Sequence, residues 1–174
     1  MLSGRQGDRR MLNDVLAPGL KLVVCGAAAG EVSAARGEYY AGPGNKFWSV
    51  LFEIGLTPRR LAPREYEDLL TFGIGLTDMA KGQAGGDASI DFRLSDPQSL
   101  RKKVKRFAPD ILAFNGKKAA QVFLGRRQME FGPQAVQVGA TRLFVAPSTS
   151  GTANGYWDAN LWRWLAKLTR EVAT

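Results

Sequence analysis

Residues 20–26 read LKLVVCG, an almost uninterrupted apolar run that ends in glycine. Runs of this kind are typical of strands buried on both faces of a parallel sheet, because such strands show no polar alternation. Residues 110–114 (DILAF) and 142–146 (RLFVA) have the same character, and residues 74–77 (IGLT) form a shorter run. We therefore expect these four segments to be strands of one parallel sheet.

Helical patterns lie between these runs. Residues 45–54 place Phe47, Leu51 and Ile54 on one face, and Asp96 followed by Pro97 predicts the start of a basic helix that reaches residue 107. We expect further helices over residues 63–72, 117–124 and 157–172. Alternating strands and helices predict an α/β fold, a three-layer α/β/α sandwich with a mostly parallel central sheet. We expect one domain over residues 1–174, with residues 1–12 as a flexible N-terminal extension.

The composition of the 174 residues narrows the chemistry. A formal net charge of +8 suits a polyanionic partner such as DNA, although many soluble domains are simply basic. The chain has no histidine and a single cysteine, which excludes an internal disulfide, a histidine triad and a four-cysteine metal site. We expect no metal and no cofactor. No apolar run approaches the ~20 residues of a membrane span, and no signal core follows the basic N-terminus, so we expect a cytoplasmic protein.

The loops that follow the predicted strands are the expected location of a site, since the carboxyl ends of parallel strands meet at one edge of a sheet. These segments are residues 26–45, 78–89, 115–117 and 147–156. The glycines of the first segment do not form the dinucleotide-binding fingerprint. A nucleotide-binding turn of another type, in an enzyme unrelated to DNA repair, remains an alternative.

Five motifs in these segments carry a resemblance. They are GAAAG at 26–30, GPGNKFW at 42–48, GIGLTDM at 73–79, AFNGK at 113–117 and PSTSG at 147–151. In order and spacing the chain resembles the mismatch-specific uracil-DNA glycosylase and thymine-DNA glycosylase family. The resemblance implies a uracil-DNA glycosylase-like fold and a monomer that binds uracil-containing duplex or single-stranded DNA. It also implies that the protein flips the base out of DNA and hydrolyses its N-glycosidic bond, which leaves an abasic site.

One position departs from the family. Ala28 stands where the family carries an asparagine that orients the attacking water, and an alanine cannot bind water. We take Asp78, at the end of the predicted strand 74–77, as the catalytic substitute, because a carboxylate can stabilise an oxocarbenium-like sugar and accept a proton from water. Two alternatives are that Asp78 caps a turn or pairs with Lys81. A third is that the protein binds damaged DNA or abasic sites without catalysis.

The resemblance also assigns the base pocket. Tyr40 aligns with the aromatic residue that stacks on the flipped base, with Tyr39 as the competing candidate and core packing as the alternative for both. Because a ring stacks and a hydroxyl does not, Tyr40→Phe is expected to be nearly silent. The other base-binding candidates are Ala27, Ala28, Asn45 and Ser148; Asn45 is expected to cap a helix or brace the pocket wall.

The last loop resembles the family's DNA-penetrating wedge, with a plain turn as the alternative. It is small and polar, which predicts weak recognition of the base opposite uracil, and its hydroxyls and glycine amides are suited to phosphates. Lys117 is the lysine expected at a phosphate, whereas the helix around residues 101–106 reads as a solvated face. The DNA-binding candidates are Lys117, Ser150, Gly151, Thr152, Ala153 and Asn154.

Overall fold

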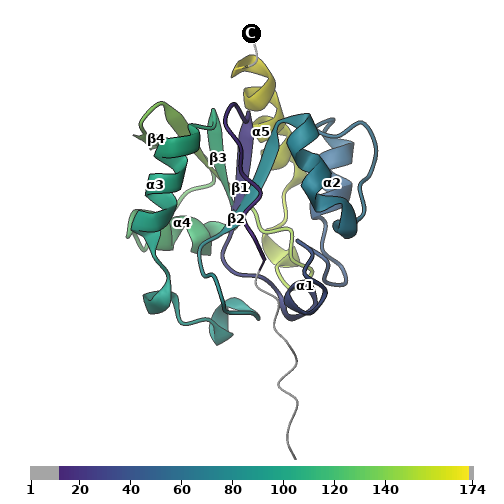
Figure 1. The fold of residues 1–174 in the computed structure, drawn as a ribbon, viewed down its shortest axis with the longest axis vertical. Coiled ribbons are helices and arrows are strands. Elements are labelled where there is room, and N and C mark those ends of the chain that lie inside the picture. Colours follow the sequence, from purple (N-terminus) through teal and green to yellow (C-terminus); the bar gives the residue numbers. More distant parts are fainter. Residues whose placement is uncertain (1–11, 173–174) are drawn as a thin grey trace, which may run out of the picture.

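The computed structural model describes residues 12–172 and shows a five-stranded sheet with helices on both faces (Figure 1). The strand order is β2-β1-β3-β5-β4, and all neighbours are parallel except β4, which pairs antiparallel with β5 at one edge. This arrangement confirms the predicted three-layer α/β/α fold. The strands are β1 (Leu22–Gly26), β2 (Ile74–Asp78), β3 (Ile111–Asn115), β4 (Gly132–Val138) and β5 (Thr141–Ala146).

The helices largely follow the sequence expectations. Asp96 accepts a hydrogen bond from the Ser99 amide and Pro97 opens α3, as predicted. The segment 63–72 is helical but has 3-10 geometry, which we label η1. The helices are α1 (Glu31–Arg36), α2 (Phe47–Glu53), η1 (Pro63–Phe72), α3 (Pro97–Phe107), α4 (Lys117–Leu124) and α5 (Ala159–Val172), with short 3-10 turns at Asp87–Ser89, Phe92–Leu94 and Asn154–Tyr156.

Strand β1 divides the core into two halves, because successive side chains of a strand point to opposite faces of the sheet. Leu22 and Val24 pack with buried side chains of α2 and α5, whereas Val23 and Cys25 pack with those of α3 and α4. Both faces of β1 are therefore covered, which explains why its sequence shows no alternation. The buried centre of the sheet gives the loops at its edge a rigid base.

The segment before β1 is tied to the sheet. Val15 exchanges two backbone hydrogen bonds with Leu76 of β2, of 2.8 and 2.9 Å. The flexible extension expected over residues 1–12 lies outside the described residues except at Leu12, which is buried in the core. Among residues 12–172, no helix is both long and apolar enough to cross a bilayer.

Candidate functional site

A cavity of about 900 Å³ opens at the carboxyl edge of the parallel strands. It lies at the lower end of the molecule in Figure 1, where α1 and the start of α4 are found. All four segments predicted to meet contribute to its wall, together with Leu12, Lys118 and Phe131. Of the predicted site residues, those that line it are Ala27, Ala28, Tyr40, Asn45, Asp78, Lys117, Ser148, Ser150, Gly151, Thr152 and Ala153, whereas Asn154 does not.

The pocket floor, defined here as Gly26, Tyr40 and Asp78, lies where β1 and β2 end. Gly26 and Asp78 are paired in register as the last residues of the two strands. The carboxylate of Asp78 leans over the glycine: a Cβ on Gly26 would lie 2.5 Å from Asp78 Oδ1 and 3.1 Å from the Tyr40 hydroxyl oxygen. Any side chain at position 26 would displace the carboxylate, so this close approach requires glycine.

Asp78 is an unpartnered acid in this floor. Its side chain is 7% exposed, and no hydrogen bond to its carboxylate forms within the described part of the chain. Burial raises the pKa of Asp78 to about 6; the positive charge of Lys81 opposes this rise and the negative charge of Asp14 adds to it. A buried acid with a pKa near neutrality is a feature of proton-transfer sites.

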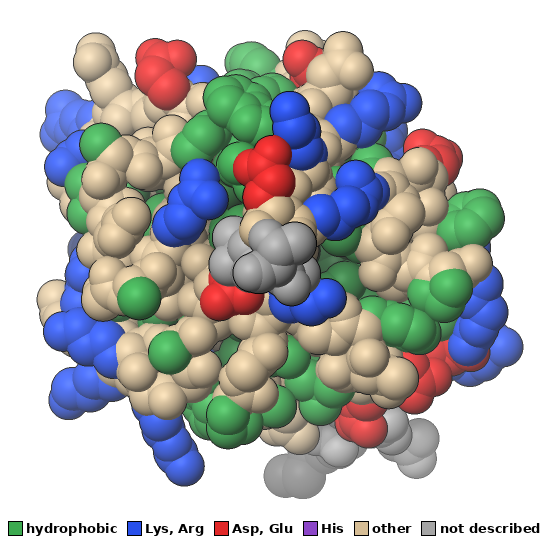
Figure 2. Space-filling model, turned by 90° about the horizontal axis from the view of Figure 1, so that it is seen from above, with side chains coloured by type: hydrophobic (Ala, Val, Ile, Leu, Met, Phe, Trp, Pro, Cys, Tyr) green, Lys and Arg blue, Asp and Glu red, His purple; other side chains and the backbone are tan. Residues whose placement is uncertain are grey.

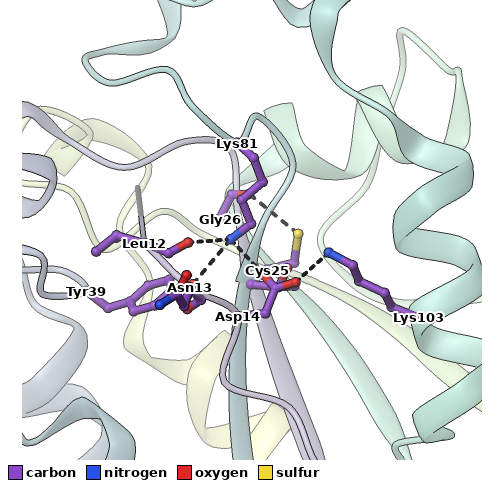
Figure 3. Close-up of polar contacts among 9 residues, drawn as sticks. Leu12, Asn13, Asp14, Cys25, Gly26, Tyr39, Lys81 and Lys103 are labelled. Carbon is purple, nitrogen blue, oxygen red and sulfur yellow. Dashed lines mark hydrogen bonds and ion pairs between the residues drawn. The ribbon is translucent and has the colours of Figure 1, made fainter. Parts of the chain in front are cut away.

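The lysine that follows Asp78 is held by a different acid. Lys81 Nζ lies 2.6 Å from Asp14 Oδ1, and Lys103 Nζ lies 2.5 Å from Asp14 Oδ2 (Figure 3). The Thr77 hydroxyl also donates to Asp14, at 2.7 Å. The alternative in which Asp78 pairs directly with Lys81 is therefore not observed. Lys81 acts on Asp78 only through its charge, and Asp14 anchors the segment before β1 to the end of β2.

Tyr40 forms one wall of the pocket. Its ring packs against Phe47 of α2, with centroids 4.1 Å apart, and its backbone has a φ of 53°, in the left-handed region that non-glycine residues rarely adopt. Phe47 therefore backs the ring from the core side. Tyr39, the competing candidate, is fully buried and donates its hydroxyl to the Asn13 carbonyl at 2.9 Å. Both tyrosines line the cavity, and Tyr40 is the less buried residue of the two.

The loop after β1 is held in place by its backbone. The Ala27 and Ala29 carbonyls accept hydrogen bonds from the Ala80 and Gly85 amides, at 2.8 and 2.9 Å. Ala28 lies between these two anchors and lines the cavity with only a methyl group. Asn45 accepts a hydrogen bond from the Phe47 amide at 3.0 Å; it lies one residue before the N-cap position, Lys46, and fastens the turn that leads into α2.

The rim loop, residues 148–156, is anchored by an amide that sequence reasoning had left out of the site. Asn115, the last residue of β3, donates from Nδ2 to Thr149 Oγ1 and accepts from the Thr149 amide, both at 3.0 Å. Gly151 packs against the turn before α2, where a Cβ would lie 3.1 Å from the Pro43 carbonyl oxygen. Both contacts hold the rim loop against the other walls of the cavity.

The polar groups of the rim loop are mostly engaged with one another. Ser148 Oγ accepts from the Ser150 amide at 3.2 Å, and the Ser150 and Thr152 hydroxyls lie 2.9 Å apart. Asn154 accepts a hydrogen bond from Lys46, which also lies over the Trp157 ring. The ammonium group of Lys117 lies 4.4 Å from the centroid of the Phe131 ring at the cavity edge.

Tyr156 is the largest residue at the cavity that sequence reasoning missed. It closes the rim loop, lines the cavity and is 74% exposed. The signal in the sequence was an aromatic residue directly after the glycine that ends a polar loop at a strand end. Basic side chains are also found at the opposite end of the molecule (Figure 2). Figure 2 views the end of the molecule where α5 finishes and shows Lys and Arg side chains spread over that face, with acidic side chains among them.

Comparisons with known proteins identify the family and agree with the fold. The model of the Uracil DNA glycosylase superfamily matches residues 14–170. The solution NMR structure of a candidate uracil DNA glycosylase from Methanosarcina acetivorans superposes with a TM-score of 0.58. That pair shares 22% sequence identity over 95% of this chain and 99% of the other, so the likeness establishes a common fold.

Proposed function

The chain belongs to the uracil DNA glycosylase superfamily, and we propose that it is a DNA-repair glycosylase of the mismatch-specific uracil-DNA and thymine-DNA type. It flips uracil out of DNA and hydrolyses the bond between the base and deoxyribose C1′. Enzymes that act on a base inside a duplex must extrude it into a pocket. The cavity at the carboxyl edge of the sheet is the pocket that this proposal assigns to the flipped base.

The observation that carries the proposal is the state of Asp78. A carboxylate that is buried, bonded to no other described group and close to neutrality in its pKa can accept a proton. Its position at the strand end matches the requirement that a catalytic group be held by rigid elements. The structure thereby supports Asp78 as the catalytic replacement for the asparagine that the family carries at the position of Ala28.

The proposed reaction balances with water as the only co-reactant. The C1′–N1 bond breaks and its electron pair leaves with the uracil, while positive charge develops on the sugar. The Asp78 carboxylate stabilises that charge and accepts a proton from the water whose oxygen bonds to C1′, as the carboxylates of glycosidases do. The proton then passes to the departing base. The products are free uracil and an abasic site.

The lysines near the cavity support a hydrolysis that stops at the abasic site. Strand cleavage through a Schiff base needs a neutral amine at C1′. Lys81 is ion-paired with Asp14 and lies 3.3 Å from the Leu12 carbonyl oxygen, while Lys117 lies over the Phe131 ring. Both side chains are engaged in these contacts, which suits binding to DNA phosphates better than covalent catalysis.

A second function is favoured by Ala28. The loss of a water-orienting amide raises the barrier to hydrolysis, so a protein with this pocket could bind damaged DNA or abasic sites without releasing the base. The same cavity and rim loop would serve both functions. The two proposals differ only in whether the N-glycosidic bond is cleaved.

A single-turnover assay separates them. Wild-type protein in excess is mixed with a fluorescent oligonucleotide that carries one uracil, and alkali then cleaves the strand at each abasic site. We expect alkali-dependent cleavage that Asp78→Ala removes, and no cleavage without alkali. Wild-type protein that binds the oligonucleotide but releases no uracil would establish the binding function instead.

A further inference from the structure

The hydroxyl of Tyr40 is buried and has no hydrogen-bond partner. Among the described residues, only the Tyr40 and Thr57 hydroxyls are in this state. The side chain of Asn115 lowers the pKa of the Tyr40 hydroxyl, and its amide is bonded to Thr149 through both Nδ2 and Oδ1, but no hydrogen bond of acceptable geometry joins it to Tyr40. Buried polar groups are nearly always paired with protein or water, so an orphaned hydroxyl in a cavity wall indicates a missing ligand.

The position of this hydroxyl identifies that ligand. The Tyr40 oxygen and Asp78 Oδ1 lie 3.1 and 2.5 Å from one point, the position that a Cβ on Gly26 would occupy. These two distances place the oxygens no more than 5.6 Å apart, a separation that one water molecule with two hydrogen bonds can bridge. Neither oxygen has another partner among the described residues.

The geometry is held by side-chain packing and by the backbone, so it is a built feature of the pocket. The ring of Tyr40 is pinned against Phe47, and its backbone adopts a positive φ of 53°. Strained backbone of this kind persists where the surrounding structure enforces it, often at functional sites. Burial, followed by the charge of Asp78, raises the pKa of the Tyr40 hydroxyl well above its usual value, so the hydroxyl keeps its proton.

We propose that the Tyr40 hydroxyl and the Asp78 carboxylate together hold the water that attacks C1′. The hydroxyl donates a hydrogen bond to the water oxygen, and the water donates one of its own protons to the carboxylate. The second lone pair of the water then faces C1′, and the proton passes to Asp78 as the C–O bond forms. This inference rests on the proposed glycosylase function. It gives the water two ligands in a pocket where Ala28 supplies none.

The inference replaces the expectation that only the ring of Tyr40 matters. If the hydroxyl holds the water, Tyr40→Phe keeps the stacking surface and loses a reacting contact. We expect its single-turnover rate of uracil release to fall about tenfold or more. Its affinity for an oligonucleotide with 2′-fluoro-2′-deoxyuridine, which binds but resists cleavage, should stay within twofold of wild type. Tyr66→Phe is the matched control, because it removes a hydroxyl that contacts Glu67 outside the cavity.

The pH dependence of the rate distinguishes the loss of the Tyr40 hydroxyl from a loss of packing. In the wild-type protein the water relays the hydrogen bond of Tyr40 to the ionised carboxylate and stabilises it. Tyr40→Phe should therefore shift the acidic limb of the rate profile to higher pH, whereas Tyr66→Phe should leave it in place. If Tyr40→Phe releases uracil at the wild-type rate and its acidic limb lies at the wild-type pH, the inference is overturned. The glycosylase proposal would still stand.

A crystal structure of the wild-type protein tests the water without any activity. We expect an ordered water within hydrogen-bond distance of both the Tyr40 hydroxyl and Asp78, and we expect it to be lost in Tyr40→Phe. A dry gap between the two oxygens would refute the inference whatever the protein's activity. A bridging water in a wild-type protein that releases no uracil would confine the inference to water binding, and its catalytic half would fall together with the proposed function.

Discussion

The pocket floor and the rim loop bound the same cavity, but they are built in opposite ways. The floor consists of strand ends in register, and the acid and the phenol there are left without partners. The rim loop consists of small polar residues whose hydroxyls bond to one another and to the local backbone. Its one large side chain, Tyr156, is exposed.

The difference separates two tasks. Unpartnered groups on rigid elements are suited to chemistry, because they can bind water and substrate without first breaking protein contacts. Loops that satisfy their own polar groups can adapt to a surface, and they determine which substrates enter. We therefore expect substitutions in the floor to change the rate of bond cleavage and substitutions in the rim to change the choice of DNA substrate.

The largest effect is expected at Asp78. Asp78→Asn removes the proton acceptor, and general-base catalysis typically contributes roughly 10²–10⁴-fold. Single-turnover release should fall by that factor while DNA binding is retained. In the wild-type protein, release should also fall as the pH drops through about 6, since Asp78 is then protonated. If Asp78→Asn and Asp78→Ala both cleave at near wild-type rates, the floor has no chemical role.

Asp78→Asn should also be more stable than the wild-type protein, which distinguishes it from a misfolded variant. The pKa of Asp78 rises from 3.8 to about 6 on folding, so the folded state binds the proton more tightly than the unfolded state does. The contribution of this group to stability is therefore full below pH 3.8 and is lost as the pH rises through 6. At pH 7 the cost is about 3 kcal/mol at most. Asp78→Asn should raise the free energy of unfolding at pH 7, measured in urea, and the gain should vanish near pH 4.

Tyr40→Ala should produce the next largest effect, and on binding as well as on rate. Loss of the ring removes a stacking surface worth ~1–3 kcal/mol, which weakens affinity for the uncleavable 2′-fluoro substrate by about 5–150-fold. Tyr66→Ala, outside the cavity, is the control for aromatic truncation. Unchanged affinity in Tyr40→Ala would mean that the flipped base does not rest on this ring, and that Tyr40 serves the floor through its hydroxyl alone.

Placing an asparagine at position 28 tests whether the attacking water can be oriented by the side chain that the family uses. Ala28 lies in the cavity wall between two backbone anchors at Ala27 and Ala29. In an Asp78→Ala background, Ala28→Asn should recover about tenfold of the lost rate, because one oriented hydrogen bond contributes ~1–1.5 kcal/mol. Ala28→Leu, which fills the same space without a polar group, should recover nothing. Equal rates for the two double variants would show that the loop aims position 28 away from C1′.

The strands and the meeting of the four loops were predictable because burial leaves a local signal. The run at residues 22–25 is apolar at every position, as expected of a strand covered on both faces. The segments that the structure adds have weaker signals: α1 has six residues, and β4 is an edge strand of alternating exposure that contains Pro133. The 3-10 geometry of η1 also lies beyond sequence patterns, which predict a helix but not its hydrogen-bond register.

The sequence predicted which residues lie at the site but not which of them contact one another. Asp78 and Tyr40 could be placed by motif, yet their shared proximity to Gly26 depends on the register of two strands and on a positive φ. The lock between Asn115 and Thr149 joins residues 34 positions apart, which no local pattern reveals. Likewise, the partner of Lys81 is Asp14 of the N-terminal segment and not the neighbouring Asp78.

The smallest expected effects concern the rim loop and the base opposite uracil. Residues 151–155 carry no large side chain, and Asn154 is engaged with Lys46. Such a loop reads the orphaned base weakly, so the ease of flipping should decide the rate. Uracil should be released opposite guanine, opposite adenine and from single strands, in the order of decreasing ease of flipping. A preference for G·U over single-stranded uracil of about a hundredfold or more, equivalent to ~2.7 kcal/mol, would mean that the loop reads guanine directly.

Tyr156 sharpens this test, because it is the rim residue large enough to occupy the gap left by a flipped base. An aromatic ring fills that gap without distinguishing the opposite base, since every base presents a π-face. Tyr156→Ala should slow release from duplex DNA about fivefold, the low end of base–aromatic stacking at ~1 kcal/mol, and leave single-stranded release unchanged. Leu94→Ala is the matched control, because Leu94 is equally exposed at 74% and lies outside the cavity. Equal slowing of Tyr156→Ala on duplex and single strands would place this ring against the flipped base or its flanking strand. It would then belong with the floor in binding substrate, and the division between floor and rim would fail at this residue.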